Sequence, residues 1–383
     1  MNHALASKLW RVAISLLGIS AVVVGLIAGA GPATASSGTT TSVSTTTSTT
    51  LPGATTTTEI SAPTTTVTGP RPTLAWPAQG SAAIMVPQLS VSAASPNQPR
   101  QPIASLTKLM TAWVVLHRLP LSVGETGPCE TVDASDMELY EYDNATDQSG
   151  VPIRLGERLC ESTLLRGMLV HSAGDYAQLL AALTGMQQAT FVADMNLTAL
   201  SLGLRQTHYV DVTGISAGDT STARNQVVVA SDLMTKESIV QSIVKLTQVS
   251  LPLAGVVTSF TPFTGQGNVI GVKSGYTSEA GGCDAMAMLD VIDGAPYTTY
   301  AVVLGEHSDN PLGTAGNDAL ALSHSIRASM ARIATPTGPQ VRWIGSPSDV
   351  DTTTTTTTST TTTSTTTTST TSATSTTTTT LIP

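Results

Sequence analysis

The sequence predicts an α+β domain in which helices flank an antiparallel sheet and a helical subdomain interrupts it. Two short apolar segments near the start of the foldable region, residues 82–86 and 89–93, have the composition of strands. Apolar residues at helical spacing dominate the middle of the chain, and strand-like segments return at residues 269–276, 285–292 and 298–304. Strands at both ends with helices between them indicate one sheet whose first and last parts meet.

Residues 1–35 have the features of an export segment. Lys8 and Arg11 precede an uncharged apolar run over residues 12–30, and the small residues Ala33 and Ala35 follow it. This order is typical of a cleaved signal peptide. The run is also long enough, at about 1.5 Å per residue, to serve as an uncleaved membrane anchor. Under both interpretations the rest of the chain is extracytoplasmic, either secreted to the cell envelope or anchored by this segment.

Two threonine-rich tracts flank the foldable region. Ser and Thr make up 22 of the 33 residues from Ser36 to Thr68 and 28 of the 29 residues from Thr352 to Thr380. Such tracts bury too little apolar surface to offset the entropy of ordering, so we expect a disordered linker over residues 36–73 and a disordered tail over residues 347–383. O-glycosylated stalks and unmodified spacers both fit this composition. The remaining residues, 74–346, suit one large domain or two closely packed lobes.

The charge balance argues against a nucleic-acid partner. The formal net charge is −9, and only 11% of the residues are charged. A basic surface that could neutralise phosphates is therefore not expected.

Three cysteines in an exported chain predict one disulfide and one free thiol. Cys129 and Cys160 each lie beside a short strand-like segment, and these two segments can pair as an antiparallel ribbon, which favours a disulfide between them. Cys283 lies in an apolar run next to two glycines. We interpret it as a small buried core residue rather than a catalytic thiol.

The helices of the middle region follow from apolar spacing. They are expected from residue 105 onward, over residues 163–183 with an interruption near 172–174, and over 191–204, 231–248 and 316–333. An Asp-Gly step at residues 293–294 favours a hairpin between the last two strands.

Ser105 and Lys108 lie three residues apart at the start of the first of these helices, so their side chains share one face. A cation near a helix N-terminus in an apolar setting has its charged form disfavoured, and a neutral Lys108 amine can take the proton of Ser105. The pattern is short and recurs at Ser242 and Lys245. We interpret this second copy as structural because it falls late in a predicted helix.

Two further segments carry groups suited to the same chemistry. In a predicted strand, Lys273 and Ser274 can bind a carboxylate while Gly275 lets a substrate backbone lie close, although a solvated lysine on an edge strand fits the same residues. Ser172, at the interrupted helix, offers a hydroxyl that can relay a proton. His171 and Asp175 lie nearby and could form a metal pair, but no third ligand follows at a familiar metal-site spacing, so no metal is expected.

In chain order, these segments resemble the Ser-x-x-Lys, Ser-x-Asn and Lys-Ser-Gly motifs of penicillin-binding serine acylation sites. The surrounding residues extend the resemblance to the D-alanyl-D-alanine carboxypeptidases of the low-molecular-weight class, serine peptidase family S11. The matching segments are residues 102–112, 164–172, 202–224 and 271–281. The resemblance covers essentially the whole predicted domain and implies a β-lactamase/DD-peptidase-like fold.

Carried over by position, the resemblance implies that Ser105 is the nucleophile, Lys108 its general base and Ser172 the proton relay. The implied substrate-binding residues are those of the third motif and its continuation, Lys273, Ser274, Gly275, Tyr276 and Thr277. The N–H groups of Ser105 and Tyr276 would form the oxyanion hole. The implied reaction removes the terminal D-Ala from a peptidoglycan stem peptide through an acyl-enzyme on Ser105, needs no cofactor, and is inhibited covalently by β-lactam antibiotics.

One position departs from the family pattern. Gly174 stands where the second motif has Asn, so an amide that would donate to the substrate and orient the lysine is missing. Loss of one positioned group of this kind lowers the rate by roughly a hundredfold unless a water or a neighbouring group replaces it. The sequence therefore leaves two functions open, a carboxypeptidase and a catalytically impaired penicillin-binding-like protein that binds the cell wall. A β-lactamase is disfavoured because no Glu-x-x-Leu-Asn segment lies between the second and third motifs.

Overall fold

The computed structural model describes residues 73–145, 148–292, 294–330 and 342–344. The predicted signal or anchor segment, nearly all of the linker and the threonine-rich tail lie outside these residues. Within the described ranges, no helix combines the length and the apolar character needed to cross a membrane.

A six-stranded sheet has the strand order β12-β2-β1-β11-β10-β9. Its strands are β1 (Ser81–Val86), β2 (Val91–Ala94), β9 (Val269–Thr277), β10 (Gly281–Ile292), β11 (Ala295–Glu306) and β12 (Arg342–Ile344). Neighbouring strands are antiparallel except β12 and β2, which are parallel. The pairing of β1 with β11, in which Ser81 lies opposite Leu304, confirms the prediction that the two ends of the domain share one sheet.

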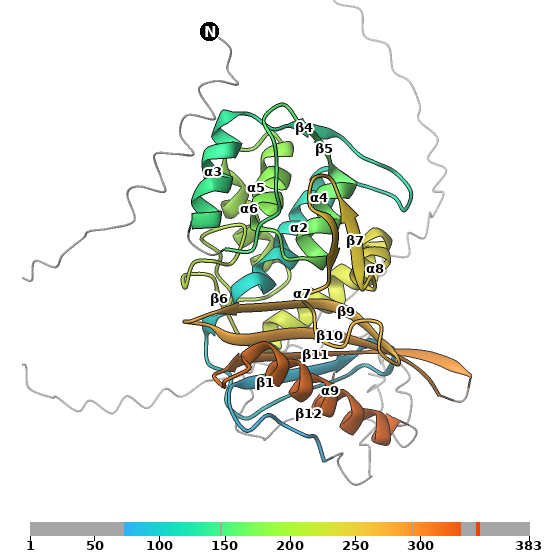
Figure 1. Cartoon of the computed structure of the whole chain (residues 1–383). Coiled ribbons are helices and arrows are strands. Elements are labelled where there is room, and N and C mark those ends of the chain that lie inside the picture. Colours follow the sequence, from blue (N-terminus) through green and yellow to red (C-terminus); the bar gives the residue numbers. More distant parts are fainter. Residues whose placement is uncertain (1–72, 146–147, 293, 331–341, 345–383) are drawn as a thin grey trace, which may run out of the picture. The chain divides into compact units, whose positions relative to one another are not determined.

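Both faces of this sheet are covered, which explains why β10 is almost continuously apolar. Cys283, Ala285 and Ala287 of β10 pack into the larger core beneath the helical region. Met286 and Met288 point to the opposite face, where they pack with α9 (Pro311–Met330) in a second core. Figure 1 shows α9 on one side of the sheet and the other helices on the opposite side.

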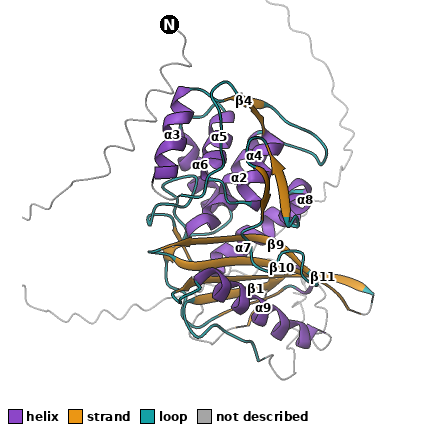
Figure 2. Cartoon of the chain, in the orientation of Figure 1, coloured by secondary structure: helices purple, strands orange, loops and turns teal. Residues whose placement is uncertain are grey.

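The helical region, purple in Figure 2, holds the elements that position the candidate site. Its helices are α2 (Thr107–Arg118), α3 (Ala134–Ala145), α4 (Glu161–Val170), α5 (Gly174–Leu183), α6 (Gln188–Ser201), α7 (Ala223–Lys236) and α8 (Ser238–Val244). Two 3₁₀ turns are η1 (Pro87–Leu89) and η2 (Ala104–Leu106). Three short antiparallel pairs complete the fold, β3 (Gln101–Pro102) with β6 (Thr220–Ser221), β4 (Cys129–Thr131) with β5 (Arg158–Cys160), and β7 (Gln248–Leu251) with β8 (Gly255–Thr258).

The prediction of one helix over residues 231–248 is wrong. Helix α7 begins eight residues earlier because the Thr222 side chain accepts the Asn225 N–H and caps it. The chain becomes extended at Glu237, with φ −111° and ψ 94°, and this residue separates α7 from α8. Gln248 already belongs to β7. The predicted interruption near residues 172–174 is present, since α4 ends at Val170 and α5 starts at Gly174.

The ribbon formed by β4 and β5 places Cys129 directly opposite Cys160. The two sulfur atoms are bonded at 2.00 Å. Cys283 is buried and carries a free thiol. The disulfide therefore closes a loop that contains the whole of α3.

We predict that replacing Cys129 and Cys160 together by serine lowers the free energy of unfolding by about 2–4 kcal/mol, because the crosslink restricts the unfolded chain across a separation of 31 residues. Urea denaturation of the oxidised protein and the double variant measures this difference. Wild-type protein treated with a reductant is the control and should match the untreated variant. Equal stability of oxidised wild type and variant would contradict a stabilising disulfide.

Candidate active site

Ser105 lies in the 3₁₀ turn η2 directly before α2, and this turn has an unusual backbone. Ala104 has φ +46°, a left-handed conformation that a residue with a side chain seldom adopts. Gly214, at φ +84°, packs against the Ala104 carbonyl so closely that a Cβ atom at this position would overlap it. The turn that presents Ser105 is thus held in place by a loop 109 residues further along the chain.

Lys108 lies one turn after Ser105 and reaches back to it. Its Nζ donates to Ser105 Oγ at 3.1 Å and to the Thr213 carbonyl at 2.7 Å. Only 3% of the residue is exposed. Burial lowers the pKa of Lys108 to about 8, although the carboxylates of Asp211 and Asp143 oppose the shift. With this pKa the amine is about half neutral near pH 8 and mostly charged below it.

The second and third motif segments meet each other through Ser172 and Lys273. Lys273 Nζ donates to Ser172 Oγ at 2.9 Å and to the Ser274 carbonyl at 2.8 Å. Ser172 connects α4 to α5 with φ +63°, which is a second left-handed residue at this site. Lys273 is fully buried, and its pKa is well below the ordinary lysine value because of burial and the nearby Lys108 charge.

Strand β9 lies at the edge of the described sheet and runs directly past Ser105. A Cβ atom at Gly275 would lie 2.6 Å from the Ser105 nitrogen, so only glycine permits this approach. The Ser274 hydroxyl donates to the Phe260 carbonyl at 2.9 Å. Tyr276 is 52% exposed, and Thr277 Oγ1 accepts the Ala280 N–H at the turn into β10. Strand β9 thus lies against the turn that carries Ser105, and Lys273 links the third motif to Ser172 of the second.

Asp211 organises the loop that supplies the Thr213 carbonyl, and sequence reasoning gave it no such role. One of its carboxylate oxygens accepts the N–H groups of Thr213 and Gly214, and the other accepts that of Ser216. The signal was present in the sequence, since an Asp followed by Gly three residues later is typical of a side-chain-capped turn.

Gly174 is the first residue of α5 and borders a space lined from other elements. A Cβ atom at Gly174 would lie 3.8 Å from Asp143 Oδ2, 3.9 Å from Thr213 Cγ2 and 3.2 Å from the Ser149 carbonyl oxygen. Asp143 comes from α3, a helix that the sequence analysis did not predict. Its side chain nevertheless ends beside the position where the family has its Asn side chain.

A second buried acid, Asp284, was also missed. It lies on β10 in register with Ser274, and neither of its carboxylate oxygens has a hydrogen-bond partner among the described residues. Burial raises its pKa well above the ordinary aspartate value, while the positive charge of Lys273 opposes the shift. The available signal was an acid among the apolar residues at the start of this strand.

The remaining sequence candidates make hydrogen bonds outside the three motifs. Ser242 Oγ donates to the Ile239 carbonyl within α8, and the exposed Lys245 follows that helix. His171 Nδ1 lies 2.9 Å from the Thr258 carbonyl oxygen, and Asp175 accepts the Val151 N–H. Across the described ranges, no group of three or more His, Cys, Asp and Glu residues has the arrangement of a metal site.

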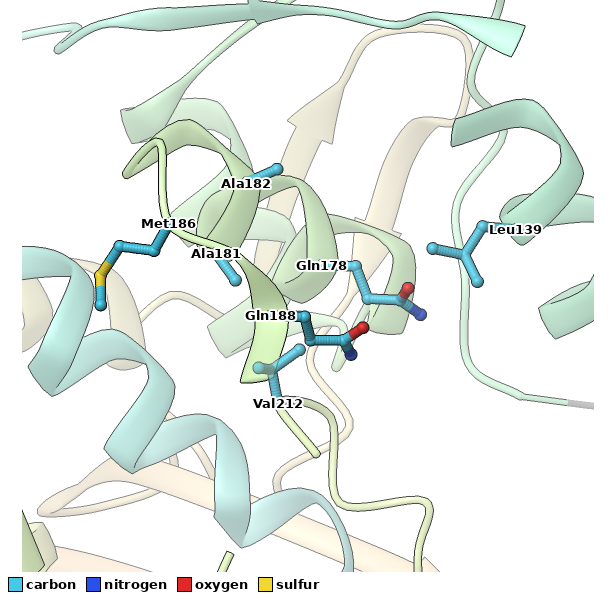
Figure 3. A pocket seen from close by; sticks show the side chains of 7 residues that line it. All are labelled: Leu139, Gln178, Ala181, Ala182, Met186, Gln188 and Val212. Carbon is cyan, nitrogen blue, oxygen red and sulfur yellow. The ribbon is translucent and has the colours of Figure 1, made fainter. Parts of the chain in front are cut away.

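A separate pocket lies between α3, α5 and the start of α6 (Figure 3). It is lined by Leu139, Gln178, Ala181, Ala182, Met186, Gln188 and Val212. None of the predicted site residues lines it. It adjoins the site through Gln178, whose Nε2 donates to Asp143 Oδ2 at 3.0 Å.

Similar proteins share both the sequence pattern and the fold. A D-alanyl-D-alanine endopeptidase of Pseudomonas aeruginosa is 33% identical over 194 residues, which are 48% of this chain and 58% of the relative. A D-alanyl-D-alanine carboxypeptidase of Streptomyces sp. strain K15 is 29% identical over 190 residues, 48% of this chain and 62% of the relative. The chain thus spans less than two thirds of the length of these curated relatives. The crystal structure of the Streptomyces K15 DD-transpeptidase superposes with a TM-score of 0.56 at 24% identity, covering 67% of this chain and 99% of that one, and so supports the fold.

One protein family matches the part of the chain that contains the candidate site. The D-alanyl-D-alanine carboxypeptidase family, Peptidase S11, aligns with residues 80–307, from the start of the sheet to the end of β11. The α+β fold predicted from the sequence agrees with this match and with the structural neighbours. The chain belongs to the S11 family of D-alanyl-D-alanine carboxypeptidases.

Proposed function

We propose that this protein is a serine-type D-Ala-D-Ala carboxypeptidase that removes the terminal D-Ala from peptidoglycan stem peptides. The observation that carries the proposal is the buried Lys108 amine, which lies 3.1 Å from Ser105 Oγ and has a pKa of about 8. This combination activates a serine hydroxyl near neutral pH. Family membership and the convergence of three motifs support the same reaction.

In the proposed acylation step, Ser105 Oγ attacks the carbonyl carbon of the penultimate D-Ala, and its proton passes to Lys108. The resulting oxyanion accepts hydrogen bonds from the N–H groups of Ser105 and Tyr276, which is consistent with the close passage of β9 past Ser105. The C–N bond then breaks, and the leaving amine receives a proton by way of Ser172. Water finally hydrolyses the ester and frees Ser105.

Substrate recognition is assigned to the third motif. Lys273 and Ser274 would bind the terminal carboxylate of the stem peptide, with the Gly275 to Thr277 backbone alongside the substrate. A β-lactam presents a strained amide and a carboxylate to the same groups, so these antibiotics would acylate Ser105. The substrate lies in the cell wall, so this proposal agrees with export by residues 1–35 and places the catalytic domain, residues 74–346, in the cell envelope between two threonine-rich segments.

The second candidate function is a wall-binding protein with little catalytic activity. Gly174 favours this alternative, because no side chain at that position can donate to a substrate or orient Lys108. The two candidates predict different behaviour toward a covalent probe, because a binder without an active nucleophile does not form an acyl-enzyme.

We predict that a fluorescent penicillin tags the full-length protein covalently and that Ser105→Ala abolishes the tag. Gel fluorescence measures tagging, and release of D-Ala from a D-Ala-D-Ala peptide measures turnover. Ser242→Ala is the matched control, since it removes the serine of the second Ser-x-x-Lys copy, and its tagging should equal that of the wild type. Folded wild-type protein that takes up no tag would favour the wall-binding alternative.

Lys108→Ala should lower the acylation rate by about a thousandfold or more, because Ser105 then has no base in contact with it. Stopped-flow or quenched labelling measures the rate, and the thermal unfolding midpoint shows whether the fold survives. Lys245→Ala, in the second copy, should acylate normally. Normal labelling of a folded Lys108→Ala variant would refute the general-base assignment.

The acylation rate should rise with pH and level off above about pH 8. Lys108 acts as a base only when it is deprotonated, so below its pKa of about 8 the rate should fall by about tenfold per pH unit. A profile of acylation rate from pH 5.5 to 9.5 tests this expectation. A rate that stays constant between pH 6 and 8 would contradict proton transfer to an amine with this pKa.

A further inference from the structure

The space beside Gly174 needs an explanation, because a family site without the second-motif Asn lacks two groups at once. An Asn side chain offers an oxygen that accepts a hydrogen bond and an NH₂ group that donates. The oxygen can orient the lysine of the first motif, and the NH₂ can donate to the substrate. A replacement from another element could restore one of these roles without restoring the other.

Asp143 is the side chain that borders this space. Its Oδ2 lies 3.8 Å from the position of a Cβ atom on Gly174, and the methyl group of Thr213 lies 3.9 Å from the same position. Thr213 is also the residue whose carbonyl accepts a hydrogen bond from Lys108 Nζ at 2.7 Å. Thr213 thus links the two groups, since its methyl group and the Asp143 carboxylate lie near the same Cβ position while its carbonyl binds Lys108.

A hydrogen bond from α5 helps to fix the orientation of Asp143. It is almost completely buried near the end of α3, and its backbone carbonyl accepts the Gln148 N–H at 2.9 Å. From α5, Gln178 Nε2 donates to its Oδ2 at 3.0 Å, and Figure 3 shows the Gln178 side chain directed from α5 toward α3. A buried and hydrogen-bonded carboxylate of this kind is held in a single position.

Lys108 and Asp143 also interact through their charges. Burial raises the pKa of Asp143 to about 6, and the Lys108 charge limits that rise. In the other direction, Asp143 raises the pKa of Lys108, together with the carboxylates of Asp211, Asp175 and Asp219. The charge of Asp211 also disfavours the ionisation of Asp143. Asp143 is thus ionised above about pH 6, when Lys108 begins to act as a base.

We propose that Asp143 is a positioning residue that replaces the lysine-orienting oxygen of the missing second-motif Asn. The inference rests on the proposed acylation of Ser105 and goes beyond it by naming a residue from α3. Asp143 orients the Lys108 amine toward Ser105 and stabilises the ammonium that forms when the amine takes the serine proton. An ionised carboxylate has no hydrogen to donate, so the substrate-donating role of the Asn remains unfilled.

The decisive kinetic test is a double-variant cycle at residues 143 and 174. Asp143→Ala should lower the second-order rate constant for penicillin acylation by about tenfold to a hundredfold. Gly174→Asn should restore most of this loss in the Asp143→Ala background, because the amide oxygen then takes over the orienting role. An Asp143→Ala variant that acylates at the wild-type rate would overturn the proposal, and so would a double variant no faster than Asp143→Ala.

A direct titration separates positioning from a merely structural effect. The chain contains only five lysines, so ¹³C-labelled lysine allows Lys108 to be followed by NMR. Asp143→Asn keeps the shape of the side chain and removes its charge, so it should lower the pKa of Lys108 and move the rising limb of the acylation profile to lower pH. The matched control is Asp136→Asn, a buried acid in the first turn of the same helix that accepts the Asp133 N–H and should leave the Lys108 pKa unchanged.

The NMR result does not depend on catalysis. If wild-type protein fails to acylate, the proposed function fails, but the effect of Asp143→Asn on the Lys108 pKa still decides whether the two groups are coupled. An identical Lys108 pKa in wild type and Asp143→Asn overturns the inference. A shift of equal size in Asp136→Asn overturns it too, since the effect would then belong to the helix and not to Asp143.

Discussion

The buried amine of Lys108 is the feature on which the rest of the site depends. Desolvation disfavours its charged form, while the surrounding carboxylates favour it, and the balance leaves its pKa at about 8. A site with fewer carboxylates would hold a weaker base, and a more exposed site would hold a permanently charged one. The hydrogen bonds to Ser105 and Thr213 then hold this amine beside the Ser105 hydroxyl.

Sequence patterns correctly predicted the elements that depend on neighbouring residues. The first helix, the interruption before α5 and the meeting of the first and last strands all follow from apolar spacing, and the structure contains them. The helix over 231–248 failed because its apolar stripe continues across Glu237, where the chain becomes extended, and apolar spacing does not report a change in backbone direction. Helix α3 was missed for a different reason, since it has few buried apolar residues and many acidic and polar ones.

In the candidate site, too, residues in short motifs were predicted and residues that only the fold brings near were not. Ser105, Lys108, Ser172 and Lys273 belong to short motifs, so their identity was visible in the sequence. Asp143 and Asp284 belong to no motif, and it is the fold that lets the charge of Asp143 raise the pKa of Lys108 and that of Asp284 raise the pKa of Lys273. The effect of each of these acids depends on residues far away in the sequence, so a local sequence pattern does not predict it. Gly174 was recognised as a departure from the family, but the side chain bordering its space could be identified only in three dimensions.

The turn that carries Ser105 is supported by two glycines from distant segments, so its geometry exists only after the domain has folded. Gly214 supports the turn from more than a hundred residues away, and Gly275 approaches the same turn from the far edge of the sheet. Before these segments come together, Lys108 is hydrated and keeps the pKa of an ordinary lysine, so the hydroxyl of Ser105 is no more nucleophilic than that of any other serine. Under the proposed function, the chain would be synthesised and moved in an unfolded form without carrying a reactive centre, and Ser105 would become reactive only in the folded domain.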